Sequence, residues 1–261
     1  MENLSGLRVS KRRYRLALLS TGILLVVALG SSFASRAALG LAVESCRLNS
    51  TLTGAAFPCL KVVQKPQPLA SYAILREPTH KERTILTPLA DVSGIEDKRL
   101  LVPDAPNYFL DAWNEWAIVM GDHANRDPWR DAALGINAAS NRTQDHLHIH
   151  MGCVSSSLKL ALNSHAADIG AEKFQRINTK SAWRSFWARF VSADQFENIN
   201  PFQLVADDVP HARADMENVT IGIVGTSRQD GQQGLYLLAE IFGDNDSYGS
   251  AEELVDPKCR L

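Results

Sequence analysis

Three histidines alternate with apolar residues near the middle of the chain, in the run Asp145-His146-Leu147-His148-Ile149-His150-Met151. Such alternation is typical of a half-buried strand, whose successive side chains point to opposite faces. It predicts three imidazoles on one face, spaced by about 6 to 7 Å, and apolar residues anchored in a core on the other. Because the chain has seven histidines in all, three within five residues indicate a shared chemical task.

Two kinds of chemistry fit this row of histidines. Histidines two positions apart on a strand can share a zinc ion, and catalytic zinc sites often combine histidine ligands with a water molecule. A third ligand from the same straight strand, His150, would be sterically awkward. Alternatively, one neutral imidazole can attack phosphorus while its neighbours orient it and bind phosphate oxygens. The residue pattern alone leaves both alternatives open.

The segments around the histidines are predicted to bring polar side chains to the row. Residues 132–138 are predicted to form a strand that carries Asn137, and residues 146–152 the neighbouring strand, ended by Gly152. The loop between these strands can turn four more side chains toward the histidines, namely Asn141, Arg142, Thr143 and Gln144. Asp145 adjoins the first histidine, but strand alternation points it to the other face, so we do not expect it to orient the imidazoles.

The rest of the pattern favours an α+β fold with an antiparallel sheet. Further strands are predicted at 72–76, 83–89, 183–191, 219–224 and 235–241, and helices at 107–125, 155–167 and 201–205. Adjacent strands with few βαβ alternations are typical of antiparallel sheets. In the helix at 107–125, Tyr108 and Phe109 begin an apolar stripe that predicts core packing.

Size and charge exclude some classes of function. The chain has 261 residues and a formal net charge of −2 at pH 7, which is enough material for one large domain or two small ones. Basic residues cluster only near the N-terminus, so a nucleic-acid-binding function is not expected.

The N-terminal segment is predicted to meet a membrane. Residues 1–15 end in a basic cluster, and residues 16–35 are almost wholly apolar and long enough to cross a bilayer as a helix. The basic flank predicts a cytoplasmic N-terminus and places the remainder of the chain on the opposite side. A cleaved signal peptide fits equally well by composition, with Ser32-Phe33-Ala34 as its cleavage site. Residues 36–70 are then expected to be a tether, and residues 71–261 the folded domain.

The four cysteines fit an exported domain. Cys46, Cys59, Cys153 and Cys259 are even in number, and none of them forms a Cys-x-x-Cys motif. In an oxidising compartment they are expected to pair, and three connectivities exist. We favour Cys46 with Cys59 and Cys153 with Cys259.

The histidine run, with its upstream asparagine and glutamine, resembles the signature of the histidine triad superfamily of nucleotide hydrolases and transferases. More narrowly, the chain resembles the bacterial CDP-diacylglycerol pyrophosphatase family after its N-terminal segment. The pieces that carry this resemblance follow one another in the family's order: Glu44-Ser45-Cys46, Pro58-Cys59, Ser71-Tyr72-Ala73-Ile74-Leu75, Pro106-Asn107-Tyr108-Phe109, Ile136-Asn137, the run from Asn141 to His150, Asn200-Pro201-Phe202, Val209-Pro210, Ala212-Arg213, Ser250-Ala251-Glu252-Glu253 and Cys259.

The resemblance implies an activity and a set of roles. The fold would be a histidine-triad-like antiparallel sheet with packed helices and a C-terminal extension, preceded by an uncleaved single-span anchor in the bacterial inner membrane, with the catalytic domain in the periplasm. The reaction would be hydrolysis of CDP-diacylglycerol to CMP and phosphatidate without a cofactor or metal. His148 would be the nucleophile, and the residues that orient it or bind phosphate would be His146, His150, Asn137, Arg142, Thr143 and Gln144. In histidine triad proteins the main helix lies near the nucleobase pocket, so the resemblance also implies a second hypothesis, in which Tyr108 or Phe109 stacks on the base.

Two other functions remain compatible with the sequence. One is a less selective, membrane-tethered nucleotide pyrophosphatase or nucleotidyl transferase, because no residue motif here reads a pyrimidine. The other is a non-enzymatic envelope protein that captures metal with the histidine row. The oligomeric state is left open.

Overall fold

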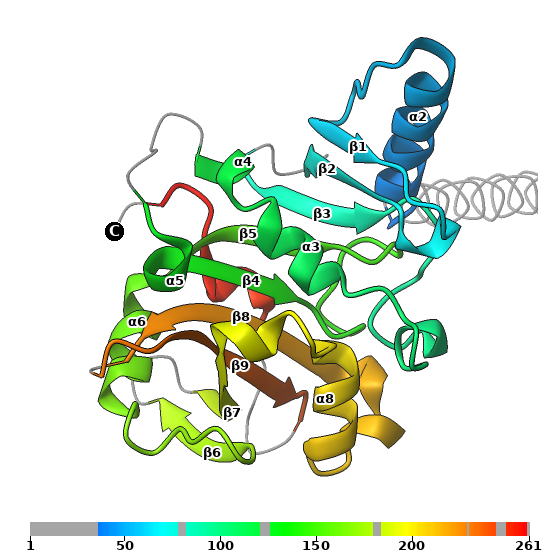
Figure 1. Cartoon of the computed structure of the whole chain (residues 1–261). Helices are drawn as coiled ribbons and strands as arrows, with labels where there is room; N and C mark the ends of the chain where they lie inside the picture. Colours follow the sequence, from blue (N-terminus) through cyan, green and yellow to red (C-terminus); the bar gives the residue numbers. More distant parts are fainter. Residues whose placement is uncertain are drawn as a thin grey trace, which may run out of the picture.

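A ten-stranded antiparallel sheet organises the molecule, as seen in the computed structural model (Figure 1). The structure describes residues 36–77, 82–120, 126–179, 184–228, 230–243 and 249–259. In chain order the strands are β1 (Lys61–Val63), β2 (Tyr72–Arg76), β3 (Thr84–Pro88), β4 (Ala132–Ile136), β5 (Ile149–Val154), β6 (Gln175–Thr179), β7 (Arg184–Ser192), β8 (Val219–Ser227), β9 (Gln233–Ile241) and β10 (Val255–Asp256). Their order across the sheet is β1-β2-β3-β5-β4-β8-β9-β7-β6, and β10 pairs with β5.

Short helices cover the sheet. They are α2 (Ala38–Thr53), α3 (Tyr108–Asn114), α4 (Ala117–Met120), α5 (Pro128–Asp131), α6 (Ser156–Ser164), α7 (Ala193–Phe196) and α8 (Pro201–Asp208). Three of them begin at a polar side chain that accepts a hydrogen bond from the first turn: Asn107 for α3, Asp127 for α5 and Asn200 for α8. Such caps satisfy backbone N–H groups that the helix itself leaves unpaired.

The two faces of the sheet carry separate cores. On the first face, α3, α7 and α8 pack on apolar residues of the central strands and of the segment that leads into β5, among them Leu147, Ile149 and Met151. The second face is covered by three different segments. α2 packs on β2 and β3, α6 packs on β7 and β9, and the C-terminal stretch around Leu254 packs on β4 and β8. Figure 1 shows α3 and α8 in front of the sheet and the red C-terminal segment behind it.

Most of the predicted elements are confirmed. The strands at 72–76 and 83–89, the hairpin of β8 and β9, and the helices α6 and α8 lie where the sequence pattern places them. The prediction of one continuous helix at 107–125 is wrong, because the helix ends at Asn114 and a second helix, α4, begins at Ala117. Trp116 lies in this break, buried, and its indole N–H donates to the carbonyl of Gly152 at 2.6 Å.

The segment at 36–70, which was expected to be a tether, contains regular secondary structure. Residues 38–53 form the 16-residue helix α2, and β1 adds a strand to the edge of the sheet. Leu39, Val43 and Cys46 lie on one side of α2 and are buried against the sheet. The segment at 36–70 is therefore a packed part of the fold. The domain boundaries proposed from sequence stay a prediction.

The predicted membrane anchor at 16–35 lies outside the residues that the structure describes. Among the described residues, no helix combines the length and the apolar character that a bilayer crossing requires.

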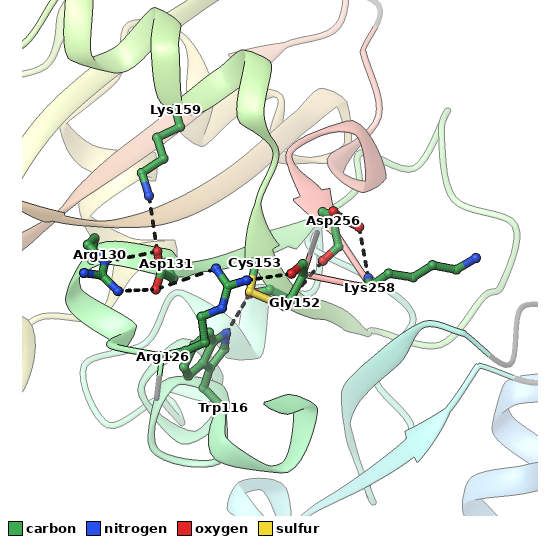
Figure 2. Close-up of a disulfide and its surroundings, with 10 residues drawn as sticks. Trp116, Arg126, Arg130, Asp131, Gly152, Cys153, Lys159, Asp256 and Lys258 are labelled. Atoms are coloured by element: carbon green, nitrogen blue, oxygen red, sulfur yellow. Dashed lines mark hydrogen bonds and ion pairs between the residues drawn. A yellow bond between two sulfur atoms is a disulfide. The ribbon is translucent and has the colours of Figure 1, made fainter. Parts of the chain in front are cut away.

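The structure contains two disulfides, and both pairings favoured from the sequence are confirmed. Cys46 and Cys59 tie α2 to the start of β1, while Cys153 on β5 is bonded to Cys259 near the C-terminus. Figure 2 shows the surroundings of Cys153, where the carbonyl of Cys259 also accepts a hydrogen bond from Arg126. The C-terminal segment is therefore held beside β5 by a covalent bond as well as by the pairing of β10.

We expect the Cys153–Cys259 bond to contribute more stability than the Cys46–Cys59 bond. The pairs are separated by 106 and 13 residues, and the chain-entropy model gives about 4.7 kcal/mol for a loop of about 100 residues and about 3 kcal/mol for one of about 15. Each disulfide is removed by replacing both of its cysteines with alanine. The free energies of unfolding of the two variants and the parent are measured by denaturant titration in one detergent. An equal or reversed ranking would contradict the expectation.

Candidate active site

The three histidines lie on the second face of the sheet, between α2 and the C-terminal segment. Their side chains are nearly buried, with exposed fractions of 6% for His146, 5% for His148 and 2% for His150. Leu147, Ile149 and Met151 point to the opposite face and are buried in its core, as the alternation predicts.

The predicted strand at 146–152 is shifted along the chain, because β5 spans Ile149–Val154. Before Ile149 the backbone leaves the sheet ladder. The N–H of Leu147 donates to the carbonyl of Val92, and its carbonyl accepts a hydrogen bond from the hydroxyl of Thr87. Only His150 therefore stands on a strand, while His146 and His148 lie on the extended segment that leads into it.

His148 is fixed in one tautomer by its surroundings. Its Nδ1 lies 2.8 Å from the carbonyl oxygen of His146. A carbonyl can only accept a hydrogen bond, so Nδ1 carries the proton and Nε2 keeps its lone pair. Burial lowers the pKa of His148 below its usual value, although the backbone hydrogen bond and the nearby charge of Glu252 act in the opposite direction. The ring is therefore neutral near pH 7, with a nucleophilic nitrogen.

His146 is held in a similar way from the neighbouring strand. Its Nε2 lies 2.9 Å from the carbonyl oxygen of Pro88, at the end of β3, so Nε2 is the protonated nitrogen. The residue two positions earlier, Gln144, is buried and accepts a hydrogen bond from the N–H of Leu39 at 2.9 Å. This bond joins the first turn of α2 to the histidine segment.

His150 meets both His148 and a carboxylate from the C-terminal segment. The ring centroids of His148 and His150 are 5.0 Å apart, with the rings nearly perpendicular. On its other side, Nε2 of His150 lies 3.4 Å from a carboxylate oxygen of Glu252. Burial alone would raise the pKa of Glu252, but the charge of His150 and a hydrogen bond from Asn137 outweigh burial and lower it. Glu252 is therefore a carboxylate near pH 7.

Asn137 positions Glu252 instead of pointing at the histidines. Its side-chain amide donates to Glu252 at 2.9 Å, and its side-chain carbonyl accepts from the N–H of Ala251 at 2.6 Å. Both bonds fix the turn at Ala251–Glu253. One asparagine thus determines where the carboxylate stands relative to His150.

Two glycines let this turn lie directly on the sheet. Gly135 pairs with His150 on one side and with Gly222 on the other. A Cβ atom at Gly135 would stand 2.9 Å from the Cβ of Ala251, and one at Gly222 would stand 2.7 Å from the side chain of Leu254. The missing side chains bring the backbone that carries Glu252 within reach of His150.

A small pocket opens beside this pair. Its cavity volume is about 10 Å³, and it is lined by Arg83, Thr84, His150, Met151, Glu252, Val255 and Pro257. The guanidinium of Arg83 lies 3.6 Å from Glu252 and 3.5 Å from the buried Glu77, and 28% of the Arg83 side chain is exposed. The pocket is far smaller than usual ligand sites of about 300 to 1,000 Å³, so a ligand of that size does not fit unless the covering segments move apart.

The other residues predicted for the site are held in ion pairs or lie exposed. Arg142 is paired with Glu96 at 2.6 Å and with Asp145 at 3.2 Å. Asp145 also pairs with Arg36 at 2.6 Å and lies exposed, which agrees with the expectation that it does not orient the imidazoles. Thr143 is exposed next to them.

Tyr108 and Phe109 lie in the core of the first face and have no exposed surface. The hydroxyl of Tyr108 donates to the carbonyl of Leu69, and the ring of Phe109 packs against Phe202 at 5.1 Å. The structure therefore does not bring these two rings to the histidines, which lie across the sheet. The core packing predicted from the aromatic stripe is confirmed.

Sequence reasoning missed Glu252 and Arg83 as members of the site. Glu252 is about 100 positions from the histidines, and only its place in the piece Ser250-Ala251-Glu252-Glu253 set it apart. In the sequence, Arg83 is only the first residue of a predicted strand. Neither residue shares a periodic pattern with the histidines, so spacing could not reveal the contact.

The arrangement defines a class of site. A buried, neutral imidazole with a free Nε2, backed by a second imidazole and a carboxylate, is suited to nucleophilic and acid–base catalysis. Among the described residues, no group of three or more histidine, cysteine or acidic side chains is arranged to hold a metal ion. The neutral imidazole of His148 and its neighbours thus make a candidate histidine-centred catalytic site.

Comparison with known proteins gives the family. The family model described as CDP-diacylglycerol pyrophosphatase matches residues 34–261. A protein of Yersinia pestis named CDP-diacylglycerol pyrophosphatase is 31% identical over 255 residues, which cover 96% of this chain and 95% of that protein. The chain belongs to the CDP-diacylglycerol pyrophosphatase family and is a hydrolase.

We expect Glu252→Gln to lower kcat for CMP release from CDP-diacylglycerol by roughly a hundredfold, while KM stays the same or falls because Arg83 loses a competing carboxylate. The substitution keeps the shape of the side chain but removes the negative charge that faces His150. The matched control is Glu253→Gln on the next, exposed residue, which should behave like the parent. Equal kcat values for the two variants would remove Glu252 from the working site.

Proposed function

We propose that the chain hydrolyses the pyrophosphate bond of CDP-diacylglycerol through a nucleotidyl-histidine intermediate on His148. One observation carries the proposal: the Nδ1 of His148 is bonded to a carbonyl, so a neutral ring presents Nε2 as its nucleophile. Family membership supports the pyrophosphatase activity itself.

The proposed reaction has two steps. Nε2 of His148 attacks the phosphorus that bears the cytidine; an N–P bond forms, the bridging P–O bond breaks, and phosphatidate leaves with the electron pair. The ring becomes positively charged, and its Nδ1–H stays bonded to the carbonyl of His146. Water then attacks the same phosphorus, the N–P bond breaks, CMP is released, and the water proton passes to the solvent. A phosphate monoester is a good leaving group, so positioning and charge stabilisation dominate.

The neighbouring histidines have supporting roles in this proposal. His146 fixes the segment that provides the carbonyl for His148, and His150 stands beside it with a ring nitrogen near Glu252. A positively charged His148 in the intermediate would be stabilised by the carboxylate of Glu252, whose charge already favours protonation of that ring.

Phosphate oxygens would be met by cations at the edge of the site. Arg83 lines the pocket with His150 and is proposed as one contact. Arg142 would have to exchange Glu96 or Asp145 for a phosphate before it could bind bidentately. Thr143 is exposed beside it and offers a hydroxyl. Asn137 and Gln144 are proposed to act by positioning Glu252 and α2.

The finer fold assignment and the location of the enzyme belong to the same proposal. We infer a histidine-triad-like sheet enlarged by the C-terminal extension, because the His-x-His-x-His run resembles that superfamily's signature and leads into the central strand β5. We also infer a single-span anchor at residues 16–35 in the inner membrane and a periplasmic site. The two disulfides support an oxidising compartment.

His148→Ala should abolish both CMP release and the covalent intermediate. The full chain in detergent, with EDTA present, is mixed with CDP-diacylglycerol labelled at the cytidine-bearing phosphate, and the denatured protein is tested for bound label. The control His165→Ala changes a histidine on another part of the surface, bonded to Asp168, and should keep both signals. CMP release by His148→Ala at the parent's rate would refute the mechanism. EDTA-sensitive release would point to a metal-dependent one.

The pH profile should show an acid limb below the ordinary histidine pKa of about 6.5. Attack requires neutral His148, and burial lowers the pKa of this ring, so activity persists at lower pH and is lost as pH falls through the lowered value. Because the charge of Glu252 raises the pKa of His148, Glu252→Gln should move the limb to still lower pH. Single-turnover rates measured from pH 4 to 8 would test both statements. A flat profile, or a limb above 6.5, would contradict them.

A further inference from the structure

We propose that the outer side of α2 and the loop after it form a surface that rests on the lipid bilayer. Five large apolar residues are exposed there, and we call them the lipid-facing patch: Leu41, Leu48, Leu52, Phe57 and Leu60. The most exposed are Leu52 at 80%, Phe57 at 75% and Leu41 at 67%. In the rest of the described chain, the large apolar residues of comparable exposure are single ones, namely Val102, Leu160 and Phe242.

Helix geometry divides α2 into two apolar sides. Leu39, Val43 and Cys46 are buried against the sheet. At about 100° per residue, Leu41, Leu48 and Leu52 lie on the opposite side, nearly 180° away. A surface helix of a soluble protein usually keeps that side polar. Figure 1 shows α2 at the rim of the molecule, with one side against β1 and β2 and the other facing outward.

The loop after α2 is fixed in place and extends the patch. The disulfide Cys46–Cys59 ties it to the middle of the helix, and the side chain of Asn49 donates to the carbonyl of Phe57 at 2.8 Å. Phe57 is therefore held beside α2 while its own side chain stays exposed. Exposed apolar residues on a covalently tied loop are costly in water, and this indicates an apolar partner.

The partner is inferred to be a lipid surface because of where the patch lies. A substrate such as CDP-diacylglycerol keeps its acyl chains in the bilayer, so the site must approach the headgroups closely. α2 is joined to the histidine segment by the bond from Leu39 to Gln144. In the sequence, the apolar run at 16–34 ends just before Arg36, where the described chain begins. The histidine segment is thus joined to the N-terminal end of α2, and in the sequence the apolar run precedes that same end.

This inference rests on the lipid substrate of the proposed function, but its test measures no catalysis. The full chain carries Leu52→Cys, labelled with an environment-sensitive fluorophore, and is reconstituted into phosphatidylcholine bilayers with or without bromine on the acyl chains. The matched control is Leu160→Cys, because Leu160 on α6 is 71% exposed and lies outside the patch. Equal thermal unfolding midpoints of the two labelled proteins and the parent establish that all are folded.

We expect brominated acyl chains to quench the label at residue 52 and to leave the label at residue 160 unchanged. Absence of quenching at 52 would overturn the proposal. A blue-shifted emission at 52 that bromine does not quench would also overturn it, because the patch would then be covered by protein, either a second copy or the N-terminal residues of the same chain. Equal quenching at both positions would show that lipid contact is not specific to α2.

Discussion

The burial of three imidazoles is the constraint on which this structure depends. A buried polar group that loses its hydrogen bonds costs about 1 to 3 kcal/mol. Each ring nitrogen must therefore have a fixed hydrogen-bond partner or lie in a space shielded from solvent. His146 is bonded to the carbonyl of Pro88, His148 to the carbonyl of His146, and His150 faces Glu252. Two of these partners are backbone carbonyls, which accept only. They fix which nitrogen of each ring carries a proton, and burial keeps the ring of His148 neutral, as its proposed role as nucleophile requires.

Segments from both ends of the described chain are needed to enclose the imidazoles. From the N-terminal side, α2 is anchored to the histidine segment through Gln144. From the C-terminal side, the turn with Glu252 is held by Asn137, by close packing over Gly135, and by the bond between Cys153 and Cys259. The sheet alone would leave the imidazoles on an open face. The two segments turn that face into a protected site.

The sequence predicts the parts of this site that are local and misses those that depend on contacts between distant segments. Alternation identifies the histidine row and the apolar anchors Leu147 and Ile149, because strand geometry repeats every second residue. The start of β5 is missed because Leu147 bonds to Val92 outside the ladder. The helix break at Trp116 is missed because the indole satisfies a carbonyl of β5. Glu252 reaches His150 only through the packing of the folded chain, which no spacing rule contains.

The two arginines proposed to bind phosphate, Arg83 and Arg142, are already paired with carboxylates. Arg83 lies between Glu77 and Glu252, and Arg142 lies between Glu96 and Asp145, so each cation is balanced by two carboxylates before any substrate arrives. An anionic phosphate that approaches Arg83 competes with Glu252 for the same guanidinium. In the proposed mechanism, displacement of Glu252 from Arg83 would leave its charge to act on His150 and His148, so the positive ring formed by attack would gain a counter-charge. Binding of the anionic substrate and stabilisation of the proposed charged intermediate would then both follow from one exchange of ion pairs.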